Sequence, residues 1–207
     1  MMEINKIIEY MKDNPKEIIK SFPEAIEYAN SINRHIYLGD IDEEVGGMVD
    51  NLIRFWNRED EDNQIPVEER EPIKLFINSG GGDLFATFTM VNSIAMSKTP
   101  VWTINTGAAY SGGFLTFISG HKRFAYPYSS FLLHEGSLTG MSGDAGKFRN
   151  FAAFYEKSLQ ILRKIVIDYT DISQEEYNAH KLEDWWFTAE EAKQYGIFDE
   201  YATEHIF

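Results

Sequence analysis

The sequence predicts an α/β fold with largely parallel strands, and two observations lead to this prediction. From residue 72 onward, short apolar runs typical of strands alternate with longer segments that have helical periodicity. Two of these apolar runs end in glycine-rich turns, at 78–82 and 107–113, and each turn leads directly into a helix. In open α/β sheets such turns lie at the carboxyl ends of the strands, where ligands bind. We therefore expect a functional site at this edge of the sheet.

The chain divides into an expected N-terminal helical element, residues 1–33, and a main domain, residues 34–207. Apolar residues of the first part recur at helical spacing, and Pro15 and Pro23 suit the first turns of helices. The sequence contains no internal repeat. A length of 207 residues is enough for one such domain with a short appendage.

The main domain is expected to begin with a strand at 36–38 and a helix from Asp42 that carries its apolar residues as far as Trp56. From Asn57 to Glu71 the chain is rich in Glu, Asp, Asn and Gln. We interpret this stretch as a solvated connection, and a partner-docking loop is the alternative.

The elements of the remaining chain follow from apolar periodicity and capping signals. The predicted strands lie at 73–77, 101–104, 123–126 and 130–133, and the predicted helices at 84–96, after the turn 107–113 as far as 118, and at 148–169. Two segments match the capping box that starts a helix, Ser173–Glu176 and Thr188–Glu191. Gly196 is expected to close the second of these helices in a left-handed conformation.

Composition and charge exclude several classes of function. With 19 Lys and Arg against 33 Asp and Glu, the formal net charge is −14, which argues against binding to nucleic acid and to anionic membranes. The chain has no cysteine, so thiolate nucleophiles, disulfides and cysteine-ligated zinc are excluded. We expect a cytoplasmic location, because no run approaches the roughly 18 apolar residues of a membrane span and the start lacks the features of a secretory signal. Neither glycine-rich turn matches a nucleotide-binding loop, so ATP or dinucleotide binding is not expected. The serine chemistry considered below requires no metal or organic cofactor, and we expect none.

Ser111 is the candidate nucleophile. It lies in the second glycine-rich turn with Gly112 and Gly113 behind it, at a predicted strand-to-helix junction. A serine in this setting is exposed for attack, and the N–H that follows it can join an oxyanion hole. The segment is not the G-x-S-x-G elbow of hydrolases, because Ala109 stands at the first glycine position. A helix-capping or packing role for Ser111 is the alternative.

A serine nucleophile needs a base and an acidic partner for that base. Of the five histidines, His134 is distinctive because it ends an apolar run at a strand end, although a structural role remains open. Asp184 precedes an aromatic cluster and a capped helix. The competing carboxylates for the third role are Asp171, Glu183 and Asp199.

From 36 to 199 the sequence resembles the ClpP family of self-compartmentalising serine peptidases, because several motifs occur in the family's order. Residues 77–82 are similar to its I-N-S-P-G-G turn and residues 107–113 to its G-Q-A-A-S-M-G segment. The Leu-Leu-His at 132–134, the segment 183–192 and the Tyr-Gly-Ile-Phe-Asp at 195–199 match three later motifs. The resemblance implies a ClpP/crotonase-like spiral of β-β-α units with a protruding handle helix at 148–169.

The resemblance also implies roles for individual residues. It makes Ser111 the nucleophile, His134 the base and Asp184 the residue that orients it, with the N–H groups of Gly82 and Gly112 as oxyanion hole. The implied substrates are peptides or unfolded proteins, the implied assembly is a homo-oligomer of two stacked heptameric rings, and a separate ATP-dependent unfoldase is an implied partner. The stretch 136–146 resembles the segment that lines the family's substrate groove.

The chain departs from the family at several positions. Gly80 replaces a proline, Tyr110 replaces a small residue before the nucleophile, and Gly112 replaces methionine. Residues 1–33 do not resemble the family's axial loops, so contact with an unfoldase stays open. The alternative functions are a crotonase-type acyl-CoA enzyme and a catalytically silent scaffold subunit. A Ser–Lys dyad that uses Lys122 or Lys147 is a further alternative chemistry.

Overall fold

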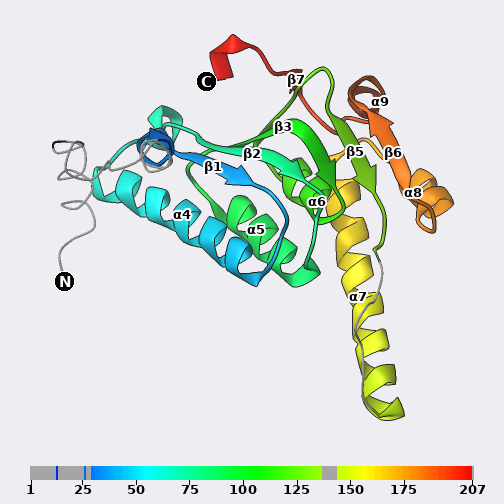
Figure 1. The fold of residues 1–207 in the computed structure, drawn as a ribbon. Helices are drawn as coiled ribbons and strands as arrows, with labels where there is room; N and C mark the ends of the chain where they lie inside the picture. The colour runs from blue at the N-terminus through cyan, green and yellow to red at the C-terminus, as the bar shows by residue number, and fades with distance from the viewer. Residues whose placement is uncertain (1–12, 14–25, 27–28, 137–143, 207) are drawn as a thin grey trace.

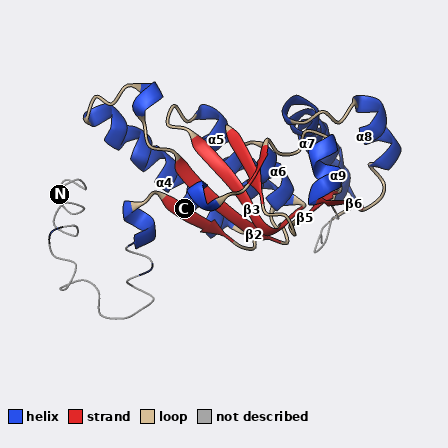
Figure 2. Cartoon of the chain, turned by 90° about the horizontal axis from the view of Figure 1, so that it is seen from above, coloured by secondary structure: helices blue, strands red, loops and turns tan. Residues whose placement is uncertain are grey.

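A mostly parallel sheet forms the centre of the protein, and helices cover one of its faces (Figures 1 and 2). The computed structural model describes residues 13, 26, 29–136 and 144–206. The predicted α/β class with largely parallel strands is confirmed. The strands are β1 His35–Leu38, β2 Ile73–Ser79, β3 Val101–Tyr110, β4 Lys122–Ala125, β5 Ser130–Leu133, β6 Trp185–Thr188 and β7 Glu200–Tyr201. The helices are α4 Glu43–Asp62, α5 Leu84–Met96, α6 Gly112–Ile118, α7 Ala145–Tyr169, α8 Gln174–His180 and α9 Ala189–Gln194, with 3-10 turns η1 Val67–Glu69 and η2 Glu204–Ile206.

The long strand β3 joins the two halves of the sheet. Its first half pairs in parallel with β4, and residues 108–110 pair in parallel with β5, while β2 runs along its other side. β5 in turn pairs antiparallel with β6. Because β3 and β5 run in the same direction and β6 runs opposite, the ends of β3 and β5 and the start of β6 meet at one edge.

The main core lies between the sheet and helices α4, α5 and α6. Alternate residues of β2 point to opposite faces, so Leu75 and Ile77 enter this core and Phe76 points to the other side. There Phe76 joins a smaller apolar cluster, which the C-terminal turn η2 completes with Ile206. Each fully buried side chain of this size contributes roughly 1.5–3 kcal/mol to stability.

The expected connection from Asn57 to Glu71 is wrong in its first part. Helix α4 continues to Asp62, and Asp60 is fully buried. Asp60 lies one turn after Trp56 on the face of α4 that packs on the core, so the helix extends beyond its last apolar residue. Only the part from Asn63 onward is a connection between α4 and β2.

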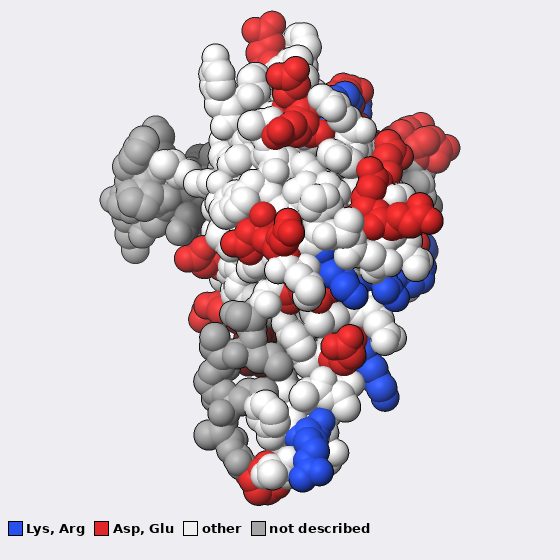
Figure 3. All heavy atoms as spheres, turned by 90° about the vertical axis from the view of Figure 1, so that its right-hand side faces the viewer, with Lys and Arg blue, Asp and Glu red and all other residues white. Residues whose placement is uncertain are grey.

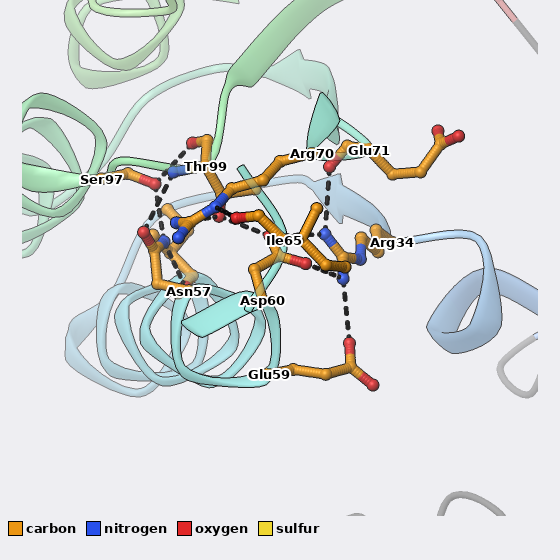
Figure 4. Close-up of polar contacts among 10 residues, drawn as sticks. Arg34, Asn57, Glu59, Asp60, Ile65, Arg70, Glu71, Ser97 and Thr99 are labelled. Carbon is orange, nitrogen blue, oxygen red and sulfur yellow. Dashed lines mark hydrogen bonds and ion pairs between the residues drawn. The ribbon is translucent and has the colours of Figure 1, made fainter. Parts of the chain in front are cut away.

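Asp60 is the centre of a polar network formed by Arg34, Asp60, Arg70 and Thr99 (Figure 4), which we call the Asp60 network. Arg34 donates from both terminal nitrogens to the Asp60 carboxylate, at 2.6 and 3.0 Å, and the Thr99 hydroxyl donates to it at 2.6 Å. Arg70 donates to the Thr99 hydroxyl at 3.3 Å and to the Ile65 carbonyl at 3.1 Å. Burial by itself raises the pKa of Asp60, but these hydrogen bonds and the charges of Arg34 and Arg70 offset it, so the pKa lies below its ordinary value.

The glycine-rich stretch at 107–110, expected to form a turn, is a strand instead. β3 continues to Tyr110, and α6 begins only at Gly112. Ala109 has partners on both sides, Ser79 of β2 and Phe131 of β5, and Ala108 pairs with Ser130 of β5. These ladders outweigh the weak strand propensity of glycine and alanine.

Helix α7 confirms the predicted helix at 148–169 and starts three residues earlier, at Ala145, where the Asp144 side chain caps it. It projects from the body of the protein (Figure 1). Both predicted capping boxes are present, at the starts of α8 and α9, and Gly196 has the expected positive φ of 61°. Within the described residues, no helix has the length and apolar character needed to cross a membrane. The predicted element 1–33 lies mostly outside the described residues, as does the stretch 137–143 of the expected groove segment.

Candidate active site

Ser111 occupies the one-residue junction between β3 and α6. Its φ of 53° and ψ of −119° lie outside the regions that residues with a side chain normally adopt. The surrounding chain holds this conformation, because the Ser111 N–H donates to the Leu132 carbonyl at 2.9 Å and its carbonyl accepts from Leu115 at 3.2 Å. A strained serine at a strand-to-helix junction is typical of nucleophiles in acyl-transfer enzymes.

His134 follows the last residue of β5, and Asp184 precedes the first residue of β6. Leu133 pairs with Trp185 in the antiparallel ladder, so one further step brings His134 opposite Asp184. The His134 Nδ1 lies 3.2 Å from Asp184 Oδ1. This contact leaves Nε2 as the ring nitrogen that can take a proton from a hydroxyl. The Asp184 side chain is 59% exposed and that of His134 is 29% exposed.

Gly82 forms an isolated parallel bridge with Ile41, next to the turn that holds Ser111. The Ile41 N–H donates to the Gly81 carbonyl and the Asp83 N–H donates to the Ile41 carbonyl, both at 2.8 Å. Neither of these two bonds uses the Gly82 N–H, which lies between them in the chain. A Cβ atom on the neighbouring Gly81 would lie only 2.7 Å from the Ser111 Cβ, so the two turns are in close contact.

Gly112 is the first residue of α6 and directly follows Ser111. An N–H in the first turn of a helix has no acceptor within the helix, so it is available to an external oxygen. The sheet therefore brings two backbone N–H groups, of Gly82 and Gly112, to the edge that holds Ser111.

The surroundings of His134 are rich in negative charge. The first turns of α8 and α9 carry two glutamates each, and Glu183 precedes Asp184. In Figure 3, which views the right-hand side of Figure 1, Asp and Glu dominate the upper part of the surface, and Lys and Arg lie mainly lower down.

Tyr110, the bulky residue before Ser111, turns away from the core side of β3. Its hydroxyl lies 2.7 Å from the Ser130 hydroxyl, and its ring meets the Trp186 ring edge-on at a centroid distance of 5.1 Å. Trp186 is 54% exposed. These contacts tie together β3, β5 and β6 next to the candidate nucleophile.

Most of the residues considered as alternatives for the catalytic roles have other partners in the structure. Asp199 forms an ion pair with Arg123 at 2.5 Å, and Glu183 lies 3.7 Å from the His180 ring, so the carboxylate in contact with His134 is that of Asp184. Lys122 pairs with Glu200 at 3.1 Å. Lys147 lies 3.8 Å from Asp144, and neither lysine contacts Ser111.

One expected contact is missing. Among the described residues, the Ser111 hydroxyl forms no hydrogen bond with His134 or with any other group. Catalytic hydrogen bonds often become short only when substrate binds, so this geometry is compatible with the assigned roles. The part of the chain that the structure describes contains no cluster of three or more His, Asp or Glu side chains suited to a metal ion.

Sequence reasoning missed the residues that hold the segment after His134. The Tyr177 hydroxyl donates to the Glu135 carboxylate at 3.1 Å, and the Tyr155 hydroxyl donates to the Glu135 carbonyl at 3.0 Å. The available signal was a charged residue directly after the candidate base. Its two partners lie 20 and 42 residues further along the chain, so no local pattern connects them.

Comparison with known proteins shows the family to which the chain belongs. The model of the Clp protease family matches residues 63–205. The ATP-dependent Clp protease proteolytic subunit 2 of Treponema pallidum is 32% identical over 129 residues, which are 61% of this chain and 64% of that protein. The proteolytic subunit of Bacteroides fragilis is 32% identical over 136 residues, 65% of each chain. Subunit 2 of Corynebacterium diphtheriae is 30% identical over 169 residues, 80% of each chain. The chain spans slightly less than two thirds of the first two relatives.

Proposed function

Because the chain belongs to the Clp protease family, we propose that it is a serine endopeptidase with Ser111 as nucleophile, His134 as base and Asp184 as the residue that orients the base. The observation that carries this proposal is the meeting of three chain segments at one edge of the sheet. A strained serine ends β3, and a histidine bound to an aspartate lies where β5 and β6 meet. Family membership also favours a peptidase over the crotonase-type acyl-CoA enzyme.

In the proposed mechanism, the Ser111 hydroxyl attacks the carbonyl carbon of a peptide bond while His134 Nε2 takes its proton. The bond between Nδ1 and Asp184 holds the imidazole in the productive tautomer and stabilises its cation. The imidazolium then returns the proton to the leaving amine, and water hydrolyses the acyl-serine through the same steps. The N–H groups of Gly82 and Gly112 stabilise the oxyanion, and each such donor is worth about 3–4 kcal/mol in comparable enzymes.

The proposal extends to assembly and partners. The protruding helix α7 exposes apolar side chains, among them Phe148, Phe154 and Ile161, each between 52 and 53% exposed. An exposed apolar face of this kind supports association between copies of the chain. We place these copies in two stacked heptameric rings that enclose the sites, located in the cytoplasm. Peptides or unfolded proteins are the substrates, and a separate ATP-dependent unfoldase would deliver folded ones.

A catalytically silent subunit is the second candidate. The observation that favours it is the missing hydrogen bond between the Ser111 hydroxyl and His134 within the described part of the chain. A silent subunit would keep the family's fold and assembly without hydrolysing peptides.

Labelling with a fluorophosphonate separates the two candidates. The expected result is stoichiometric modification of the assembled protein at Ser111, lost in Ser111→Ala and accompanied by cleavage of short peptides. Ser129→Ala serves as the control, because Ser129 is a buried serine that donates to the Tyr126 carbonyl away from the site. An assembled particle that is neither labelled nor active would identify a silent subunit.

A further inference from the structure

The strand that carries His134 loses its ladder at the candidate base. The last pair between β5 and β6 is Leu133 with Trp185, and within the described part of the chain no ladder pair fixes the backbone beyond it. Among the residues that the structure describes, the His134 side chain bonds only to Asp184, whose own side chain is mostly exposed. Something else must fix the direction in which the chain leaves His134, because the imidazole orientation depends on the backbone on both sides of it.

Glu135 supplies this fixed point through bonds to two different helices. From α8, the Tyr177 hydroxyl donates to the Glu135 carboxylate at 3.1 Å, and from α7 the Tyr155 hydroxyl donates to the Glu135 carbonyl at 3.0 Å. Tyr177 is only 2% exposed, so its phenol cannot exchange this acceptor for water. We propose that Tyr177 and Tyr155 form a tyrosine clamp on Glu135 that positions His134 for proton transfer.

The electrostatics of the clamp agree with this role. Burial and the Glu135 carboxylate raise the pKa of the Tyr177 phenol far above its ordinary value, so the hydroxyl keeps its proton and acts as a donor. Burial and the same carboxylate raise the pKa of Tyr155. Hydrogen bonds to a charged acceptor are stronger than neutral ones, which suits a contact that must hold a chain segment in place.

The clamp also links the base to the rest of α8. His134, Glu135 and Tyr177 line a small cavity together with Leu133, His180, Lys181 and Trp185. The His180 ring stacks on Trp185 at a centroid distance of 4.1 Å, and Trp185 is the ladder partner of Leu133. The residues on either side of His134 are therefore held by one unit, formed by α8 and the start of β6.

The inference rests on the proposed peptidase function, and Tyr177→Phe is its main test. This change keeps the buried ring and removes only the hydroxyl. The expected result is a fall of about tenfold in kcat for cleavage of a short fluorogenic peptide, with KM changed less than twofold, because the base is misplaced while the substrate contacts remain. Tyr155→Phe leaves the bond to the Glu135 carboxylate intact and is expected to lower kcat by about threefold.

Two further variants show whether Glu135 transmits the effect. Glu135→Gln keeps an oxygen acceptor and should retain kcat within about threefold, whereas Glu135→Ala should match Tyr177→Phe. The double variant Tyr177→Phe/Glu135→Ala should be no slower than the slower single variant, since both remove the same interaction. Tyr195→Phe is the matched control, because this partly buried tyrosine packs on Trp185 without a hydroxyl partner among the described residues.

A second measurement does not depend on activity. In protein with carbon-13-labelled histidine, the imidazole signals of His134, identified with His134→Gln, should be sharp in the wild type and broadened by exchange in Tyr177→Phe. An active wild type in which Tyr177→Phe matches Tyr195→Phe in kcat and in these signals would overturn the clamp. A wild type without labelling or cleavage would overturn the peptidase instead, and the His134 signals would still decide whether the clamp orders the ring.

Discussion

Arg34 and Ser111 both have a positive φ, of 56° and 53°, but their side chains differ in their hydrogen bonds. The Arg34 guanidinium bonds to Asp60, Glu59 and the Glu71 carbonyl (Figure 4). The Ser111 hydroxyl has no partner among the described residues. A positive φ is unfavourable for both residues, so contacts with the surrounding structure must stabilise it.

The carboxylates at the two sites differ in the same way. Asp60 is fully buried and accepts hydrogen bonds from Arg34 and Thr99, whereas the Asp184 side chain is mostly exposed and contacts His134. A buried carboxylate whose acceptors are all used contributes to stability and cannot take part in a reaction. An exposed carboxylate with one partner contributes little to stability and can follow a change of charge on that partner. Both residues are aspartates, so burial and the number of hydrogen bonds, and not residue type, distinguish the structural Asp60 from Asp184, for which we propose a catalytic role.

The first prediction concerns Asp184 and has the largest expected effect. Asp184→Asn should lower kcat/KM for peptide cleavage by about 10⁴-fold, because an amide at this position favours the wrong imidazole tautomer. The free energy of unfolding should change by less than about 0.5 kcal/mol, since the side chain is exposed. Steady-state kinetics and urea unfolding measure the two quantities. Glu183→Gln, at the neighbouring exposed position, is the control and should retain most of the activity. Equal losses in both variants would show that Asp184 has no specific role.

The second prediction concerns Asp60. Asp60→Asn should lower the free energy of unfolding by about 3 kcal/mol, because it leaves the mostly buried charge of Arg34 without its main partner. Activity per folded molecule should be unchanged. Asp62→Asn, an exposed position on the same helix, is the matched control and should have almost no effect. A stable Asp60→Asn protein with reduced kcat would contradict the purely structural role of Asp60.

The same two regions show how far the sequence predicts this molecule. The motif order around Ser111, His134 and Asp184 identified the candidate residues, and the pairing of β3, β5 and β6 brings them to one edge. The role of Asp60 was not predictable, because its acidic surroundings resemble a solvated connection. Its partners Arg34 and Thr99 lie 26 and 39 residues away in the chain.

A second failure has the same physical origin. The glycine and alanine residues at 107–109 suggested a turn because their local propensity is unfavourable for a strand. Ladder partners on β2 and β5 decide the structure, and such pairing depends on segments that local patterns do not connect. Elements with their own periodicity or caps, such as α7 and the two capping boxes, were predicted correctly.

The third prediction concerns the packing around Gly112, the residue after Ser111. A Cβ atom on Gly112 would lie 2.3 Å from Thr87 Oγ1, a fully buried group that donates to the Asp83 carbonyl. Gly112→Ala should therefore lower the free energy of unfolding by about 2 kcal/mol, measured in urea. Adding Thr87→Ala should recover more than half of this loss, giving a coupling energy above about 1 kcal/mol. Additive losses would mean that the two residues do not meet.

The last prediction concerns the pH dependence of the stability that Asp60 contributes, and it has the smallest expected effect. Because the folded-state pKa of Asp60 is lowered by Arg34, Thr99 and Arg70 against the opposing effect of burial, its contribution to stability is fully present above the unfolded value of about 3.9. That contribution is lost only as pH falls through the lower, folded-state pKa. The difference in unfolding free energy between wild type and Asp60→Asn should thus be constant from neutral pH to about pH 4 and shrink below it. Peptide cleavage per folded molecule should depend on pH in the same way in wild type and in Asp60→Asn, because Asp60 takes no part in the proposed reaction. If the pH profiles of activity differed between the two proteins, Asp60 would take part in the reaction, and the division between a saturated structural carboxylate and a reactive one would not hold.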